Sequence, residues 1–435
     1  MRTDTAARLA GGAAFAVAVG LAALLTRIGF RPRLKMDDPA AFARASTLGD
    51  QLEEAKASGH PVHILHVHGI RAYGAGGAQV FMQGLVREGG LQGPAVGPDG
   101  AFERLERFTT NLGPRPANAT VLGQTVFPCD LGWARSQPFV DRYLFRRDGQ
   151  VVAVLDELNW WPLLFPFKCR FLVGPDAALS GPDRQDLEAC SQDDDTHFPW
   201  LSPDEAKSAE RTRTISGGSA IANGLVKHAM FAWGLSDAVI ALGDVRTLIH
   251  EAIDQAFAYA ADYEGRGVGE QHFAVVAESL GAFVVLDAAA VCGRAREVMD
   301  SACDIWLFAN QFPLLELARV AHLHSGAGAA APAAATPQLH GLLHRWATAP
   351  RAGLVMSRPR QVLAFSDPSD ALTWLVPKLA AAPEEPEPIV VNILDRNEFD
   401  FFHLAADPIS AHTGHAHNRA VLRLMLTPNR PAGAF

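Results

Sequence analysis

A strand-to-helix junction with one serine at its corner places the strongest constraint on how this chain can fold. Residues 273–276 (Phe-Ala-Val-Val) predict a buried strand, and residues 281–286 (Gly-Ala-Phe-Val-Val-Leu) predict the apolar face of a helix. Small residues, Ala277 and Gly281, flank Ser279 two positions away on each side. A large side chain at either position would collide with backbone in a sharp turn. The pattern therefore predicts that the Ser279 hydroxyl stands clear of the sheet, at a helix N-terminus that favours a developing anion.

Strand patterns alternate with helix patterns along most of the chain. Strands are expected at 61–68, 304–308, 361–365 and 389–394, helices at 79–88 and 244–261, and a tight hairpin turn at Asp148-Gly149. This alternation predicts an α/β fold with a mostly parallel, doubly wound sheet covered on both faces. The expected domain spans residues 61–425, after a linker helix at 36–60 and before a tail at 426–435.

Two segments within this domain interrupt the alternation. Residues 110–215 are irregular and contain an aromatic run at 160–167, which predicts an insertion or cap. The run could recognise acyl chains and contact a membrane surface, but the preferred interpretation is that it forms the core of the insertion. Residues 325–337 are rich in Ala, Gly and Pro and predict a flexible loop.

The N-terminus carries an uncharged run from Leu9 to Leu25, at the short end of what crosses a bilayer. We expect an uncleaved membrane anchor within residues 1–35, because no small-residue cleavage site follows the run. A cleaved signal peptide and an amphipathic helix packed on the domain are the alternatives. More basic residues follow the run than precede it, which favours a cytoplasmic domain, at the inner membrane if the protein is bacterial.

Composition excludes several classes of protein. The 435 residues are 49% hydrophobic and 20% charged, which is ordinary for a globular protein. A net charge of −9 argues against a nucleic-acid partner. Five cysteines without a CxxC pair argue against a disulfide framework and against a structural zinc site.

The chain supplies possible partners for Ser279. Serine is a weak nucleophile until a base takes its proton, and histidine is the usual base near neutral pH, with an acid holding the imidazole in the right tautomer. Asp370 lies in a loop after the strand at 361–365, and His412 follows the strand at 389–394. Both are expected at the carboxyl edge of the parallel sheet, where Ser279 also lies.

Three segments together resemble serine hydrolases of the α/β-hydrolase superfamily, the lipases and esterases. They are 66–70 (His-Val-His-Gly-Ile), 277–281 (Ala-Glu-Ser-Leu-Gly) and 411–414 (Ala-His-Thr-Gly). Ala277 replaces the first glycine of the family's G-x-S-x-G motif, a mild steric change. The resemblance implies Ser279 as nucleophile, Asp370 as acid and His412 as base, in the family's chain order. It further implies an oxyanion hole made by the backbone N–H groups of Leu280 and Ile70.

Several residues compete for these roles. Asp367 is the alternative acid, since Asp-Pro at 367–368 is common in turns. Asp370 is preferred because Ala371-Leu372 after it is the continuation usual in the family. His415 is the main alternative base, followed by His403 and His417. His68 is expected to be structural by the same resemblance.

A metal site is a further alternative. His63, His66 and His68 are expected to project from one face of one strand, and His66-x-His68 is how some metallohydrolases begin their metal site. Gly69 directly after the pair fits an oxyanion turn better, and no Asp-x-His-x-His pattern is present. We therefore expect no metal and no cofactor.

The function expected from the sequence is hydrolysis of an ester-like substrate by a membrane-attached serine hydrolase through an acyl-enzyme. Lipid and other apolar esters are the candidate substrates. The alternative from another class is a catalytically silent member of the same fold that serves as a membrane-attached binding or scaffold protein. A His-ligated metallohydrolase is the least favoured alternative.

Overall fold

A computed structural model gives the structure of most of the chain. It describes residues 34–69, 78–112, 120–121, 124–125, 137–164, 236–243, 245–311, 313–315, 341–349, 359–370, 372–379, 386–396, 400–401, 405–406 and 408–429. The expected membrane anchor, most of the insertion and the loop at 325–337 lie outside the described residues. No helix among the described residues is long and apolar enough to cross a membrane.

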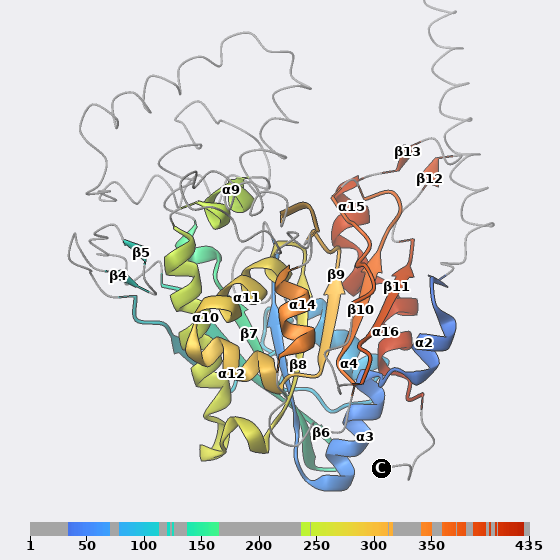
Figure 1. The fold of residues 1–435 in the computed structure, drawn as a ribbon. Coiled ribbons are helices and arrows are strands. Elements are labelled where there is room, and N and C mark those ends of the chain that lie inside the picture. Colours follow the sequence, from blue (N-terminus) through green and yellow to red (C-terminus); the bar gives the residue numbers. More distant parts are fainter. Residues whose placement is uncertain are drawn as a thin grey trace, which may run out of the picture.

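The centre of the fold is a nine-stranded mixed sheet in the order β1-β11-β10-β9-β8-β2-β7-β6-β3 (Figure 1). The strands are β1 Lys35–Met36, β2 Val62–Val67, β3 Glu106–Thr109, β6 Phe139–Arg147, β7 Gln150–Asn159, β8 His272–Glu278, β9 Asp304–Phe308, β10 Gln361–Ser366 and β11 Ile389–Leu394. The six strands from β11 to β7 are parallel to one another, whereas β1, β6 and β3 pair antiparallel at the two sides. The protein is therefore an α/β protein with a mostly parallel sheet, as the alternation of patterns predicts.

Helices cover both faces of the sheet (Figure 1). One face carries α10 (Arg246–Ala261), α11 (Leu280–Val291), α12 (Gly293–Ser301) and α14 (Gly341–Thr348), and the other carries α2 (Pro39–Arg44), α3 (Leu48–Ser58), α4 (Gln79–Arg87) and α16 (Arg419–Leu426). Each layer encloses its own hydrophobic cluster, because successive strand residues point to opposite faces. On β2, for example, Leu65 packs in the first cluster and Ile64 in the second.

The segment expected to be a linker helix forms part of the packed body. Its first residue, Met36, belongs to β1, which pairs with β11, and the segment contains the two helices α2 and α3. Helix α3 begins at a capping box in which the Thr47 side chain accepts from the Asp50 N–H, while Asp50 accepts from the Thr47 N–H. Leu48 and Leu52 of this helix are fully buried in the second cluster. Residues 36–60 are thus part of the packed core, because the second cluster includes side chains from both α2 and α3.

The hairpin expected at Asp148-Gly149 joins β6 to β7. Asp148 and Gly149 both have positive φ angles, 51° and 82°, as a two-residue turn with the twist of the flanking strands requires. The aromatic run that follows β7 starts in the core: Trp160 is fully buried, and its Nε1–H donates to the His68 carbonyl oxygen at 3.0 Å. Trp160, Leu163 and Leu164 pack in the first cluster, so the start of the run belongs to the core of the main sheet layer. Residues 165–167, and most of the insertion whose core the run is expected to form, lie outside the described part.

Candidate active site

Ser279 occupies a strained backbone position between β8 and α11. Its φ and ψ angles are 52° and −121°, a region that residues other than glycine rarely adopt. The Ser279 N–H donates to the Phe308 carbonyl oxygen of β9 at 2.7 Å, which ties the corner to the neighbouring strand. The turn expected from the small residues around Ser279 is therefore present, and the strain in it is held by the surrounding backbone.

Two glycines let the chain pass close to this corner. A Cβ atom on Gly281 would lie 2.5 Å from the Val67 carbonyl oxygen and 2.6 Å from that of His68, so α11 packs directly against the end of β2. A Cβ atom on Gly69 would lie 2.5 Å from the Cβ of Ser279. The residue types at 69 and 281 are thus set by the approach of two backbone segments.

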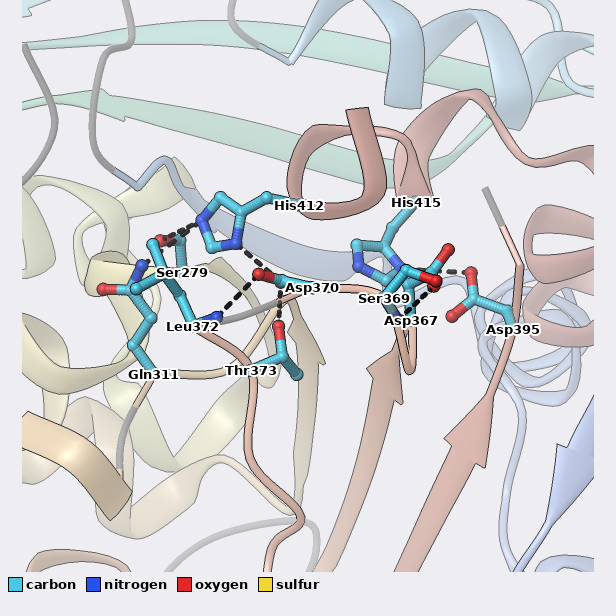
Figure 2. Close-up of polar contacts among 10 residues, drawn as sticks. All are labelled: Ser279, Gln311, Asp367, Ser369, Asp370, Leu372, Thr373, Asp395, His412 and His415. Atoms are coloured by element: carbon cyan, nitrogen blue, oxygen red, sulfur yellow. Dashed lines mark hydrogen bonds and ion pairs between the residues drawn. The ribbon is translucent and has the colours of Figure 1, made fainter. Parts of the chain in front are cut away.

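The structure brings Ser279, His412 and Asp370 together in one hydrogen-bonded chain (Figure 2). The Oγ atom of Ser279 lies 2.7 Å from Nε2 of His412, and Nδ1 of His412 lies 2.7 Å from Oδ2 of Asp370. The three come from separate elements: Ser279 follows β8, Asp370 follows β10, and His412 lies in α15 (Pro408–Thr413). With the Nδ1 proton facing the Asp370 carboxylate, Nε2 presents its lone pair to the serine hydroxyl.

The Asp370 carboxylate is fixed by several donors. Its Oδ1 accepts from the Leu372 N–H at 2.9 Å, and its Oδ2 accepts from the Thr373 hydroxyl as well as from His412. Burial raises the pKa of this carboxyl, but the hydrogen bond from His412, the charge on His412 and the bonds from Thr373 and Leu372 outweigh burial and hold the pKa below its ordinary value. The carboxylate is therefore charged at neutral pH and can orient the imidazole.

The alternative residues have other partners in the structure. The Oδ1 atom of Asp367 accepts from the Ser369 N–H at 2.8 Å, forming a local turn. Nδ1 of His415 lies 3.0 Å from Oδ2 of Asp395 (Figure 2). The His415 ring also stacks on Phe308. His417 lies in the same short 3-10 helix, η7 (His415–His417), and His403 lies outside the described residues.

A cavity opens directly beside the serine hydroxyl. Its described lining residues come from the ends of β2, β8 and β9 and from the segment around α15: Gly69, Glu278, Ser279, Phe308, Ala309, His412, Thr413, His415 and Ala416. A ligand in this cavity would contact both Ser279 and His412. The site therefore has space for a reacting group on the side of the hydroxyl.

Sequence reasoning missed the roles of two residues at the site. Glu278, next to Ser279, lines the cavity and pairs with the buried His66, whose Nε2 lies 3.2 Å from Oε1 of Glu278. Burial raises the pKa of the Glu278 carboxyl, but the hydrogen bond and charge of His66, with smaller effects from His68 and His415, lower it below its ordinary value. Gln311 contacts His412. Only its position after a strand that ends at this edge could have indicated it.

The structure describes one of the two backbone N–H groups that are expected to form the oxyanion hole. Leu280 is the first residue of α11, and its N–H is one of the first in the helix, which have no acceptor within the helix. Ile70 lies outside the described residues. The preceding turn is fixed, because His68 stacks on Trp160 and its Nδ1 lies 2.8 Å from the Gly69 carbonyl oxygen.

The expectation that His63, His66 and His68 share one face of a strand is wrong. Residues three apart on a strand point to opposite faces, so His63 packs on Tyr263 and Phe273 while His66 stacks on Phe81 across the sheet. Within the described part of the chain, no group of three or more His, Cys, Asp or Glu side chains is arranged to hold a metal ion.

Comparison with known proteins identifies no relative of the chain. No family model matches it, no curated protein matches its sequence, and no solved structure matches its fold.

Proposed function

We propose that this protein is a serine hydrolase that cleaves ester-like substrates, and that its sheet and helices form an α/β-hydrolase fold. The observation that carries the proposal is the hydrogen-bonded chain from Ser279 through His412 to Asp370 at the carboxyl edge of the parallel strands. The order of these residues along the chain, nucleophile, acid and histidine, supports it, as does the strained turn that holds Ser279.

The proposed reaction follows from the contacts. The Oγ atom of Ser279 attacks the carbonyl carbon of the ester, and Nε2 of His412 takes the hydroxyl proton. The Asp370 carboxylate stabilises the resulting imidazolium. The C–O bond of the ester then breaks, the imidazolium gives its proton to the departing oxygen, and a water molecule releases the acyl group from Ser279 by the same route.

The developing oxyanion needs hydrogen-bond donors. The N–H of Leu280 is the proposed donor on the side of α11, where the helix dipole also favours negative charge. The N–H of Ile70 is the second proposed donor, by resemblance to the family. Removing one such donor typically costs about 10²–10³ in rate.

The proposal also covers the kind of ester that is cleaved and the place of the protein in the cell. An apolar or lipid-like ester fits the apolar run at 9–25, which we propose anchors the protein to a membrane. The excess of basic residues after the run supports a cytoplasmic hydrolase domain. No metal or other cofactor is needed for the chemistry described.

A series of 4-nitrophenyl esters with acyl chains of increasing length tests the proposal. Purified wild-type protein should release nitrophenol, and Ser279→Ala should lower kcat/KM by about 10³-fold or more while leaving the fold intact. Turnover that persists in Ser279→Ala would contradict the proposal. Folded wild-type protein that neither turns over these esters nor reacts with a fluorophosphonate would favour the binding or scaffold alternative.

A further inference from the structure

The side-chain amide of Gln311 contacts Nε2 of His412, the atom that also contacts the Ser279 hydroxyl. Its Nε2 is 3.3 Å from Nε2 of His412, which in turn is 2.7 Å from Oγ of Ser279, and the amide is buried (Figure 2). Because Nδ1 of His412 holds its proton toward Asp370, Nε2 has a single lone pair. The Ser279 hydroxyl and the Gln311 amide N–H therefore share one acceptor in the resting site.

The backbone on both sides of Gln311 is fixed. The Ala309 N–H donates to the Phe365 carbonyl oxygen at 3.1 Å, and the Trp374 N–H donates to the Asn310 carbonyl oxygen at 3.0 Å. The carbonyl of Gln311 accepts from the Leu315 N–H at 3.1 Å. These bonds connect the segment to β10, to the loop after Asp370 and to the residues that follow, so the amide is placed by the packed sheet edge.

Protonation of His412 changes what this amide can bind. Once Nε2 has taken the serine proton, it is an N–H donor. The Gln311 N–H can then no longer donate to Nε2. The oxygen that next receives the proton from Nε2 must lie within hydrogen-bond distance of that atom. An amide 3.3 Å from Nε2 lies within reach of the same oxygen.

We propose that Gln311 is a catalytic residue that donates a hydrogen bond to the leaving-group oxygen of the ester. The proposal rests on the proposed function of Ser279 and His412. As the bond between carbon and the leaving oxygen breaks, its electron pair passes to that oxygen, which accepts the proton from Nε2 of His412 and the hydrogen bond from Gln311. This stabilisation matters most when the oxygen leaves as a basic alkoxide, so the assigned substrate class is esters of aliphatic alcohols.

The test compares two esters with the same acyl group, one of 4-nitrophenol and one of an aliphatic alcohol. The alkoxide develops the greater negative charge and needs the donor more. In Gln311→Leu, kcat/KM should fall about 10–100-fold for the alkyl ester, because the loss of a hydrogen bond to a charged oxygen slows a reaction by about that factor. For the nitrophenyl ester kcat/KM should fall by less than about 3-fold. The matched control is Gln92→Leu, a substitution of an exposed glutamine outside the cavity lining, which should leave both values unchanged.

Other outcomes separate the causes of failure. Equal losses on both esters, or no loss on either, would overturn the role of Gln311 while leaving the proposed function standing. Activity of wild-type protein that does not depend on Ser279 would instead refute the proposed function. If Gln311→Leu does not fold, Gln311→Met keeps the side chain unbranched and removes the same donor, and fluorophosphonate titration counts the intact sites.

Discussion

A Cβ atom placed on Gly69 would lie 2.5 Å from the Cβ of Ser279 and 2.7 Å from the carbonyl oxygen of Glu278. Contacts this short force the neighbouring atoms to move, and here the neighbours are the backbone of Glu278 and the side chain of Ser279. The absence of a side chain at position 69 thus holds the end of β2 and the serine turn at the separation the site needs.

Gly69→Ala should therefore disturb the site. Displacement of Ser279 from His412 by a fraction of an ångström to 1 Å is expected to lower kcat/KM by about 10²-fold, and overpacking should destabilise the fold by about 1–3 kcal/mol. Gly293→Ala is the control, because a Cβ there meets no atom within 4 Å. Ester hydrolysis and thermal unfolding measure the two effects, and an active Gly69→Ala enzyme would contradict the close approach.

Matched substitutions of Asp370 and Asp367 test which of these two carboxylates orients His412. Asp370→Asn keeps the size of the side chain but removes the charge that holds the Nδ1 proton of His412, so kcat/KM should fall by about 10³–10⁴-fold. Asp367→Asn is the matched control: an asparagine oxygen can still accept from the Ser369 N–H, so the loss should stay below about 5-fold. The reverse pattern in ester hydrolysis would assign the role to Asp367.

The strain at Ser279 predicts a difference in stability between two variants that both lack the hydroxyl. Ser279→Ala removes the hydroxyl but keeps the unfavourable φ of 52°, whereas Ser279→Gly removes both. The strain costs about 1–3 kcal/mol and the extra flexibility of glycine in the unfolded chain about 0.5–1 kcal/mol. Ser279→Gly should thus have the higher free energy of unfolding, by about 1 kcal/mol in urea denaturation. Equal stability would mean that the turn relaxes in the absence of the hydroxyl.

His63 predicts sensitivity of the fold to acid. Burial, and then the charges of Arg142, Arg266 and His272, lower the pKa of His63 to about 3 in the folded protein, against about 6.5 in the unfolded chain. Between these pH values the unfolded chain takes up a proton on His63 and the folded protein does not. The contribution of a neutral His63 to the free energy of unfolding is therefore complete above about pH 6.5 and is lost as the pH falls toward about 3. The difference of about 3.5 pKa units corresponds to a loss of up to about 5 kcal/mol in the free energy of unfolding.

His63→Phe should remove this part of the pH dependence, because phenylalanine fits beside Tyr263 and Phe273 and does not titrate. Urea unfolding at a series of pH values measures it, with the exposed His417 changed to asparagine (His417→Asn) as the control. An unchanged pH profile in His63→Phe would show that other groups cause the acid sensitivity.

Local patterns indicated much of the central fold. The strands expected at 304–308 and 389–394 have those bounds, and the turn at Ser279 lies where its small neighbours place it. Such features depend on apolar runs and on steric limits within a few residues, which can be read in one sequence. The chain positions of Asp370 and His412 also indicated that they could meet Ser279, because parallel strands end at the same edge.

Other long-range pairs in the structure could not be predicted. No local signal places Lys35 beside Leu394 in an edge strand, Asp395 beside His415, or Gln311 beside His412, because each pair is made by tertiary packing. The error over His63 had a different cause: the spacing of three residues was visible in the sequence, and it reverses the side of the strand.

The most direct test of the account is covalent labelling of the folded protein with a fluorophosphonate, followed by peptide mass mapping. Nucleophilic attack by an activated serine predicts one adduct, on Ser279, formed rapidly in wild-type protein, lost in Ser279→Ala and strongly slowed in His412→Ala. Labelling at another residue, or labelling of Ser279 at the same rate after removal of the His412 imidazole, would contradict the proposal that the contact between these two side chains activates the serine.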